Sequence, residues 1–320
     1  MKPSMVVAII VGAIASLIII MMIVSTINHS IRLNRERTAY PPPGEMLQVG
    51  GKTIHVYGEG ESEPTLVFLA GHGTSCPTLD FKPLWGRLVD QCRIVVVEKS
   101  GYGWSHVSES PRDIETILEE TRKALKITGE KGPFVLVPHS MSGLEAIHWA
   151  QKYPEEVKAI IGLDPSVPET YDLLPKPSNS QLNLLHFISK IGVTRFIPEG
   201  ELSKNLPLID SDDLSEEEKK KYRAMFFRST LTKDMLREVE HLEENSSIVG
   251  KGEIPKNTPM YFFISQQQDQ MIKGWEDALL SYLSNIDKKE YMLLDTGHYV
   301  HHEKSELIDR EIRDFLSGIN

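Results

Sequence analysis

Residues 135–144 read VLVPHSMSGL, and this stretch decides the fold. Three apolar residues predict the end of a buried strand, and the residues from Ser142 onward have helical spacing. Ser140 therefore lies where a strand must turn sharply into a helix. That geometry exposes the hydroxyl, directs the helix N-terminus at a charge forming beside it, and requires small neighbours. We expect Ser140 to be a nucleophile that needs a histidine base and a carboxylate to orient that base.

Strand-like and helix-like runs alternate on both sides of this stretch. The predicted strands are residues 65–69, 93–97, 134–137, 158–163, 260–264 and 290–294. The predicted helices are residues 83–91, 114–127, 142–152 and 307–316. Residues 47–49 and 53–57 are expected to form a hairpin around Gly50-Gly51. Apolar strands separated by helices are typical of an α/β fold, with a mostly parallel central sheet and helices on both faces.

The alternation is interrupted between residues 166 and 255. This segment has helix-like stretches near Leu182–Ile191, Ser215–Phe227 and Thr232–Glu244 and no clear strand. A helical segment between two strands of one sheet is interpreted as a cap. We therefore expect one domain over residues 45–320 that carries this cap.

An apolar run precedes the domain. Residues 5–24 contain no charged side chain, and as a helix they would be about 30 Å long, the thickness of a bilayer's hydrocarbon core. A buried core helix would normally show a polar stripe. A cleaved signal peptide usually has a shorter apolar centre and a small-x-small cleavage site, and Ser25 to Asn28 offers no convincing one. The favoured interpretation is a transmembrane anchor, with a signal peptide as the alternative.

A polar, basic linker is expected over residues 25–44, ending in Pro41-Pro42-Pro43-Gly44. Lys2 and the terminal amine precede the apolar run, and Arg32, Arg35 and Arg37 follow it. The positive-inside rule leans toward a cytoplasmic domain. The difference is only one or two charges, so it does not assign the side of the membrane.

The charge balance excludes some partners. The chain has 35 basic and 45 acidic residues, a net charge of −10. Residues 1–38 hold four basic residues and one acidic residue, so the remainder has 31 and 44, a net charge of −13. An acidic body without a long Lys/Arg run does not predict nucleic-acid binding. The two cysteines, Cys76 and Cys92, cannot build a disulfide framework and are expected to be buried.

From about Leu47 to its C-terminus the chain resembles the α/β-hydrolase family. The resemblance rests on the strand–helix alternation, the position of the insert and several loop motifs. The family's nucleophile motif is Gly-x-Ser-x-Gly, and here the matching residues are Pro138-His139-Ser140-Met141-Ser142. Both outer glycines are thus replaced, one by the small Ser142 and one by the bulkier Pro138. The resemblance implies that Ser140 is the nucleophile.

The family's catalytic residues follow the order serine, acid, histidine. By this resemblance the base is His298, in the loop after the last predicted strand. The preferred acid is Asp269, which follows the strand near residues 261–264, and the alternative is Asp164, at the end of an earlier strand. Asp295 is too close to His298 along the chain to orient it and is interpreted as a turn former.

The resemblance also implies an oxyanion hole of two backbone N–H groups. Met141, directly after the nucleophile, supplies one. The loop Gly71-His72-Gly73-Thr74 supplies the other, with His72 preferred and Thr74 as the alternative register. Residues 98–105 resemble the family's Asp-x-x-Gly-x-Gly-x-Ser loop, for which we expect a structural role.

His298, His301 and His302 have a spacing that could bind a metal together with an outside ligand. The preferred interpretation is that His298 is the base and the other two are solvated or cap the last helix. His139 is expected to shape the turn at Ser140. Neither a metal nor a cofactor is predicted.

The implied function is that of a membrane-anchored serine hydrolase, which cleaves an ester or thioester through an acyl-enzyme intermediate. The expected partners are a small acyl substrate with an apolar acyl group and the membrane. Two enzyme alternatives remain, a proline-iminopeptidase-like aminopeptidase and a cofactor-free peroxidase, because fold does not fix the reaction. The aminopeptidase would need a cap acid for the substrate amine, for which Ser211–Glu218 is a candidate source. An inactive, membrane-tethered binding module is the third alternative, kept open by Pro138.

Overall fold

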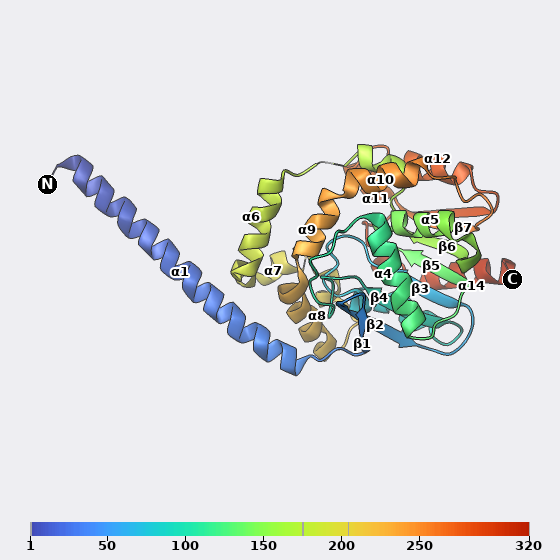
Figure 1. The fold of residues 1–320 in the computed structure, drawn as a ribbon, viewed down its shortest axis with the longest axis horizontal. Coiled ribbons are helices and arrows are strands. Elements are labelled where there is room, and N and C mark those ends of the chain that lie inside the picture. The colour runs from blue at the N-terminus through green and yellow to red at the C-terminus, as the bar shows by residue number, and fades with distance from the viewer. Residues whose placement is uncertain (1, 175, 204, 320) are drawn as a thin grey trace.

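The structure is a computed structural model that describes residues 2–319 apart from residues 175 and 204. Figure 1 shows a long N-terminal helix projecting from the body, a central sheet flanked by helices, and further helices between the sheet and the N-terminal helix. The two termini lie at opposite ends of the molecule.

One sheet of eight strands forms the centre, in the order β1-β2-β4-β3-β5-β6-β7-β8. From β4 to β8 the neighbouring strands are parallel, and the β1–β2 hairpin joins β4 in antiparallel orientation. The strands are β1 (Glu45–Val49), β2 (Lys52–Glu59), β3 (Thr65–Leu69), β4 (Arg93–Glu98), β5 (Phe134–Pro138), β6 (Val157–Leu163), β7 (Met260–Ser265) and β8 (Lys289–Leu294). The predicted, mostly parallel sheet is confirmed.

Helices cover both faces of the sheet because successive strand residues point to opposite sides. In β3, Val67 and Leu69 pack on one face, and Leu66 and Phe68 pack on the other. The first face is covered by α4 (Ile114–Ile127), α5 (Ser142–Lys152) and α12 (Trp275–Ser284), and the second by α3 (Lys82–Leu88) and α14 (Ser305–Gly318). All five residues of β3 are consequently buried.

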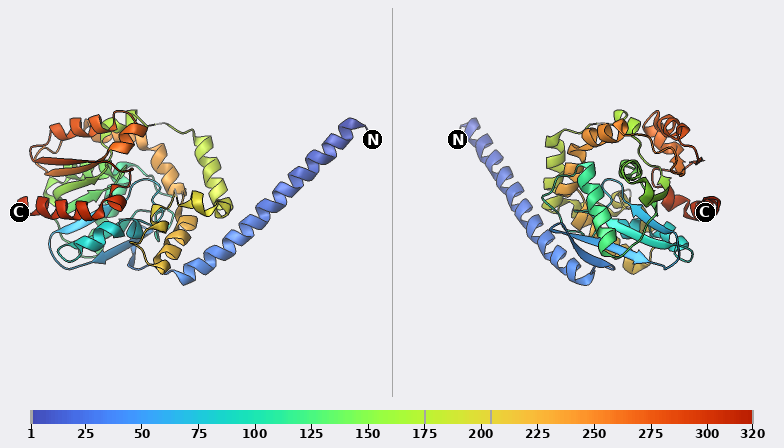
Figure 2. Two further views of the ribbon diagram at one scale, coloured as in Figure 1. Left: turned by 180° about the vertical axis from the view of Figure 1, so that it is seen from behind. Right: turned by 45° about the vertical axis from the view of Figure 1, so that its right-hand side comes forward.

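Helices alone form the described part of the insert between β6 and β7. They are the 3₁₀-helix η2 (Pro168–Asp172), α6 (Asn179–Lys190), η3 (Val193–Phe196), α7 (Glu199–Leu202), η4 (Pro207–Asp210), α8 (Glu216–Ser229), α9 (Lys233–Glu240) and α10 (Leu242–Lys251). Side chains such as Leu206, Leu214 and Phe226 form a separate apolar cluster with Trp104 of the core. The insert therefore packs onto the sheet domain as a cap. The views in Figure 2 place it on the side of the body nearest the N-terminal helix.

The N-terminal helix α1 (Pro3–Ala39) is continuous. It contains a window of mean hydropathy 3.1 with none of its residues buried in the body, and it is the one helix in the described chain long and apolar enough to cross a membrane. Residues 25–39 were expected in a linker but belong to this helix, because no proline or glycine occurs between residue 25 and Pro41.

The carboxylate of Glu98 organises the loop of residues 98–105. Its oxygens accept hydrogen bonds from the backbone N–H and hydroxyl of Thr78 (3.2 and 2.8 Å) and from the N–H of Trp104 (2.7 Å). Its Oε2 also lies 2.9 Å from Nδ1 of His55. These contacts tie the loop to β2 and to the start of α2 (Pro77–Asp80), which gives it the structural role expected from its sequence.

Gly103 of this loop tests that role. It has a φ of +47°, and a Cβ atom there would collide with the Glu98 carboxylate. We expect Gly103→Ala to lower the free energy of unfolding by about 2 kcal/mol or more, because the backbone is strained and the carboxylate is displaced. The measurement is urea unfolding of the purified full chain in detergent.

A second Gly→Ala substitution provides the control. Gly86 lies in an exposed position of α3, and no atom lies within 4 Å of a Cβ built there. Because alanine is the better helix former, Gly86→Ala should raise the stability by about 0.5–1 kcal/mol. Equal stabilities of the two variants would contradict the role assigned to Glu98.

Candidate active site

Ser140 occupies a tight turn between β5 and α5. Its φ is +53°, a conformation rare for a residue with a side chain. The Ser140 carbonyl accepts hydrogen bonds from the N–H groups of Gly143 (2.9 Å) and Ser166 (2.8 Å), which fixes the turn. A Cβ atom at Gly71 would lie 2.8 Å from Cβ of Ser140, so the Gly71 loop passes directly beside Ser140. This is the strained, crowded turn that the sequence predicted.

The two departures from the family motif fit this turn. Pro138 is the last residue of β5 and pairs in register with Leu69 of β3. The Ser142 hydroxyl lies 2.6 Å from the Leu69 carbonyl and 3.0 Å from the N–H of His139. Ser142 thus ties the turn to β3 through a polar contact that glycine could not make.

The partly exposed His298 forms a pair with the buried Asp164. His298 follows β8, and its Nδ1 lies 2.6 Å from Oδ2 of Asp164. The other oxygen of Asp164 accepts hydrogen bonds from the N–H of Ser265 (3.0 Å) and from the indole of Trp275 (2.9 Å). Asp164 is completely buried, so these donors replace the water that its carboxylate has lost. The arrangement fixes the orientation of the His298 ring.

The carboxylate that lies beside the His298 ring is that of Asp164, the alternative acid, and not that of Asp269, the preferred one. The strand β7 continues directly into α11 (Gln266–Met271), and this helix carries Asp269 away from the end of the sheet. There the Asp269 carboxylate accepts hydrogen bonds from the N–H groups of Gly274 and Glu276, both at 3.1 Å. Asp269 therefore caps the start of α12.

Two backbone N–H groups near Ser140 are candidates for binding an oxyanion. Among the residues that the structure describes, no acceptor bonds to the N–H of His72 or of Met141. His72 follows Gly71, the residue that packs against Ser140. The alternative donor, Thr74, directs its N–H at the Gly71 carbonyl (3.4 Å). The geometry thus favours His72 over Thr74 as the partner of Met141.

Comparison with known proteins identifies the family. Residues 64–305 match the family described as alpha/beta hydrolase fold.

The chain belongs to the alpha/beta hydrolase family. The uncharacterized protein YbdG of Bacillus subtilis (strain 168) is 38% identical over 250 residues, which are 78% of this chain and 76% of YbdG. The 2-(acetamidomethylene)succinate hydrolase of Mesorhizobium japonicum is 27% identical over 118 residues, which are 37% of this chain and 41% of that enzyme.

Solved structures show the same fold. A loop variant of the haloalkane dehalogenase DbeA from Bradyrhizobium elkanii superposes with a TM-score of 0.62 at 18% identity, covering 86% of this chain and 96% of that one. The enol-lactonase from Burkholderia xenovorans LB400 superposes with a TM-score of 0.58 at 14% identity, covering 85% and 100%. At these identities the likeness concerns the fold alone, and it confirms the predicted alpha/beta hydrolase fold. The family and its hydrolase relatives support a hydrolase.

In this alpha/beta hydrolase a group of aromatic rings surrounds His298. The His139 ring lies 4.7 Å from the His298 ring, centroid to centroid, and its Nε2 lies 3.2 Å from the His298 carbonyl. Burial lowers the pKa of His139 well below its ordinary value, and the neighbouring His298 and His301 lower it further. A neutral His139 therefore links the turn at Ser140 to the His298 loop, in agreement with its expected shaping role.

His301 and His302 meet a third candidate ligand, Asp80. Ligand atoms of these three residues lie within 4.8 Å of one another, close enough for a metal ion. However, Nε2 of His302 lies 2.9 Å from the Asp80 backbone carbonyl, and a nitrogen that donates there cannot also bind a cation. Nε2 of His301 lies 3.3 Å from Oδ2 of Asp80. We interpret the group as hydrogen-bonded side chains that fasten α13 (Val300–Glu303) to α2.

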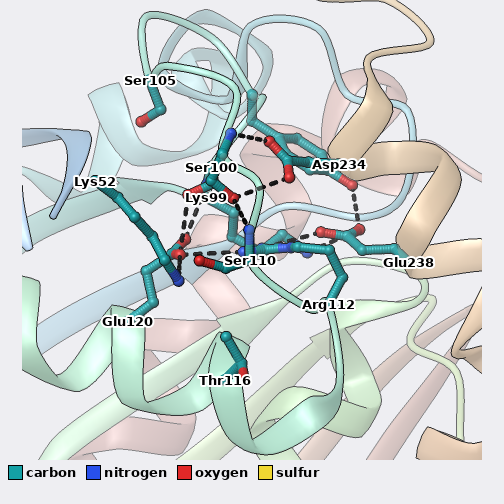
Figure 3. A network of polar contacts seen from close by, with 12 residues as sticks. Lys52, Lys99, Ser100, Ser105, Ser110, Arg112, Thr116, Glu120, Asp234 and Glu238 are labelled. Atoms are coloured by element: carbon teal, nitrogen blue, oxygen red, sulfur yellow. Dashed lines mark hydrogen bonds and ion pairs between the residues drawn. The ribbon is translucent and has the colours of Figure 1, made fainter. Parts of the chain in front are cut away.

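The sequence did not indicate a cluster of buried charges beside the site (Figure 3). Lys99 Nζ lies 2.5 Å from Oε1 of Glu145 and 3.7 Å from Oε2 of Glu238. Arg112 lies 3.1 Å from Glu120 and 3.2 Å from Glu238. Each of these five side chains is buried. The signal in the sequence is weak, because each partner is remote from the others along the chain.

Glu238 brings the cap into this cluster. It lies on α9, accepts a hydrogen bond from the Tyr102 hydroxyl (2.5 Å) and places Oε2 at 3.9 Å from Nδ1 of His72. Burial alone would raise the pKa of its carboxyl, but Lys99, His72 and Arg112 hold it well below its ordinary value. Glu238 is therefore ionised and joins the cap to the loop that carries an expected oxyanion donor.

This assignment predicts how stability depends on pH. A carboxyl whose pKa is lower in the folded chain stabilises the fold above its unfolded pKa of about 4.3, and this contribution is lost as the pH falls. Glu238→Gln should therefore lower the free energy of unfolding by about 3 kcal/mol at pH 7. The difference from the wild type should narrow below about pH 5, where the unfolded wild-type carboxyl takes up a proton.

Urea unfolding at several pH values measures both effects. Glu240→Gln is the matched control, because Glu240 lies on the same helix and is exposed. That variant should stay close to the wild type at every pH. A Glu238→Gln variant with wild-type stability at pH 7 would refute the proposed link between cap and core.

Proposed function

We propose that this chain is a membrane-anchored serine hydrolase that cleaves an acyl ester or thioester. One observation carries the proposal: a serine on a strained strand-to-helix turn is linked through the adjacent His139 to a loop whose histidine is hydrogen-bonded to a buried carboxylate. This combination of nucleophile, base and orienting acid is the one that acyl transfer requires.

In the proposed reaction, Ser140 attacks the acyl carbonyl and passes its proton to Nε2 of His298. Asp164 keeps the Nδ1 proton of His298 directed toward its carboxylate and stabilises the imidazolium that forms. The N–H groups of His72 and Met141 bind the oxyanion of the tetrahedral intermediate. His298 then protonates the leaving group, and a water molecule, activated by the same ring, releases the acyl group from Ser140.

The cap offers space for an acyl group. A cavity of about 430 Å³ lies between η2, α6, α9 and α10, with Tyr171, Leu174 and Leu242 among its lining residues. Cavities of a few hundred Å³ hold small-molecule ligands. Tyr171 lies five residues after Ser166, whose N–H binds the Ser140 carbonyl. The partly apolar lining of the cavity supports an acyl group with apolar character.

The aminopeptidase alternative receives less support. The cap acid beside His72 is Glu238, which Lys99 and Arg112 already neutralise. Ser211–Glu218 is the other candidate source of an acid for the substrate amine. There the Glu218 carboxylate forms an ion pair with Lys82 and accepts a hydrogen bond from Ser215. Neither of these two carboxylates is left for a substrate amine, which supports an ester or thioester as the preferred substrate class.

We propose that residues 5–24 form a transmembrane anchor and not a cleaved signal peptide. The helix that contains them continues into the body, where Ser25, His29 and Glu36 contact the cap. Cleavage next to Ser25 would remove or loosen contacts on which this part of the cap depends. A retained helix with an exposed apolar surface of this length fits a bilayer.

Labelling with a fluorophosphonate probe tests the triad in the full chain. The wild type should be labelled and Ser140→Ala should not be. Asp164→Asn should slow the hydrolysis of a nitrophenyl ester by about 10³–10⁴-fold, because the histidine loses its orienting acid. Asp269→Asn is the matched control and should stay near the wild-type rate. A wild type that is folded but not labelled would favour the binding-module alternative. If Asp269→Asn is inactive while Asp164→Asn stays active, the acid is Asp269 and not Asp164.

Substrate choice separates the enzyme alternatives. We expect turnover of nitrophenyl esters, rising with acyl length until the cavity is filled, and no turnover of amino-acid anilides. Initial rates at equal substrate concentration measure both. Faster cleavage of the anilides would support the aminopeptidase instead.

A further inference from the structure

The cap is fastened to α1 at the point where the apolar run ends. The hydroxyl of Ser25 donates to the carbonyl of Ile191 at 2.7 Å. Arg195 places Nε at 2.8 Å from Nδ1 of His29 and its two terminal nitrogens at 2.8 and 2.7 Å from the carboxylate of Glu36. The segment from the end of α6 through η3 is therefore held beside the exit of α1 from the body (Figure 1).

The same segment carries exposed apolar side chains. Phe196 is 68% exposed and Leu184 is 58% exposed, and three more large apolar residues are exposed with them. We call this set the α6–η3 face, and it consists of Leu184, Leu185, Phe187, Val193 and Phe196. Five exposed large apolar side chains within thirteen residues are typical of a binding surface.

The opposite side of α6 is bonded to the rest of the cap. Nδ1 of His186 lies 2.7 Å from the carbonyl of Leu231, and the hydroxyl of Ser189 donates to the carbonyl of Thr230 at 3.1 Å. Leu182 is buried on this side, whereas Leu184 lies on the other side of the helix from His186 and points away from the body. In Figure 1, α6 runs across the direction of α1 and lies on the side of the body toward the apolar end of that helix.

We propose that the α6–η3 face is embedded in the surface of the lipid bilayer that α1 spans. This inference rests on the proposed transmembrane anchor. If residues 5–24 lie in the hydrocarbon core, the bilayer boundary falls near Ser25, which is bonded to the residue directly after α6. A helix that crosses the direction of a spanning helix at that level lies along the interface. An apolar face is stable there, as in interfacial amphipathic helices.

Charges near the boundary agree with this placement. Lys190, at the end of α6, and Arg32 and Arg35, on the turns of α1 after the boundary, are exposed. Basic side chains at this level can direct their charged ends toward lipid phosphates while their stems cover apolar surface. The occupant of the face is therefore a bilayer surface that includes anionic headgroups.

Fluorescent reporters on the full chain test the placement. Cys76 and Cys92 are buried and unpaired, so a new surface cysteine is the one that a polar fluorophore reaches. The reporters are Leu184→Cys and Phe196→Cys on the face, and the matched control is Tyr291→Cys. Tyr291 is 53% exposed and lies on β8, the edge strand farthest from β1 in the sheet. Each labelled chain is reconstituted in vesicles of phosphatidylcholine and phosphatidylglycerol.

Brominated lipid should quench the two face reporters at least about threefold more strongly than the control, and aqueous iodide should quench them less, because interfacial residues contact acyl chains. Equal lipid quenching at all three positions, in chains that float with the vesicles, would overturn the embedding of the face. If neither quencher reaches the face reporters, and this protection is lost when the protein is diluted in excess lipid, the face binds a second copy of the chain. That result would also contradict the embedding of the face in the bilayer. Chains that do not float with the vesicles would refute the anchor itself, which is a separate result.

Discussion

The contacts of the Asp164 carboxylate are those on which the rest of the site depends. This side chain is completely buried and bonded to Ser265 at the end of β7, to Trp275 of α12 and to His298 after β8. A buried carboxylate without donors would be strongly unfavourable, so these segments must come together for the fold to form. The hydrogen bonds of Asp164 therefore hold these segments together at the carboxyl edge of the sheet. The same carboxylate also orients the ring of His298, the proposed base.

The cap depends on a second buried charge. Glu238 is the cap's carboxylate in a cluster whose cations, Lys99 and Arg112, belong to core loops. Removing one partner would leave a buried charge uncompensated, which costs far more than the intact pair contributes. The main effect of the cluster is therefore to determine where the cap sits on the core. Its net contribution to the free energy of unfolding is small beside the cost of breaking it. Because Glu238 also approaches His72, the cap's position and the geometry of the oxyanion loop are linked.

Much of the fold was predictable because it depends on local pattern. Each strand is visible as an apolar run, and α3, α4, α5 and α14 are visible through helical spacing, whereas α12 was not predicted. Ser140 is visible as a serine between a strand-like and a helix-like run. The acid was not predictable in this way, since Asp164 and Asp269 both follow buried strands. What separates them is that α11 begins directly after β7, which makes Asp269 a cap of α12. The charge cluster escaped prediction because Lys99 and Glu238 meet only through the tertiary fold.

The segment after the apolar run changes how the body relates to a membrane. Its polar and basic composition predicted a linker between the apolar run and the domain. Instead, Ser25, His29 and Glu36 continue one helix and bond to the cap segment that contains Arg195. A spanning helix with such contacts orients the body as well as tethering it. In the proposed placement, the contacts that fix α1 against the cap bring the α6–η3 face to the bilayer surface, and Asn179 at the start of α6 also lines the cap cavity.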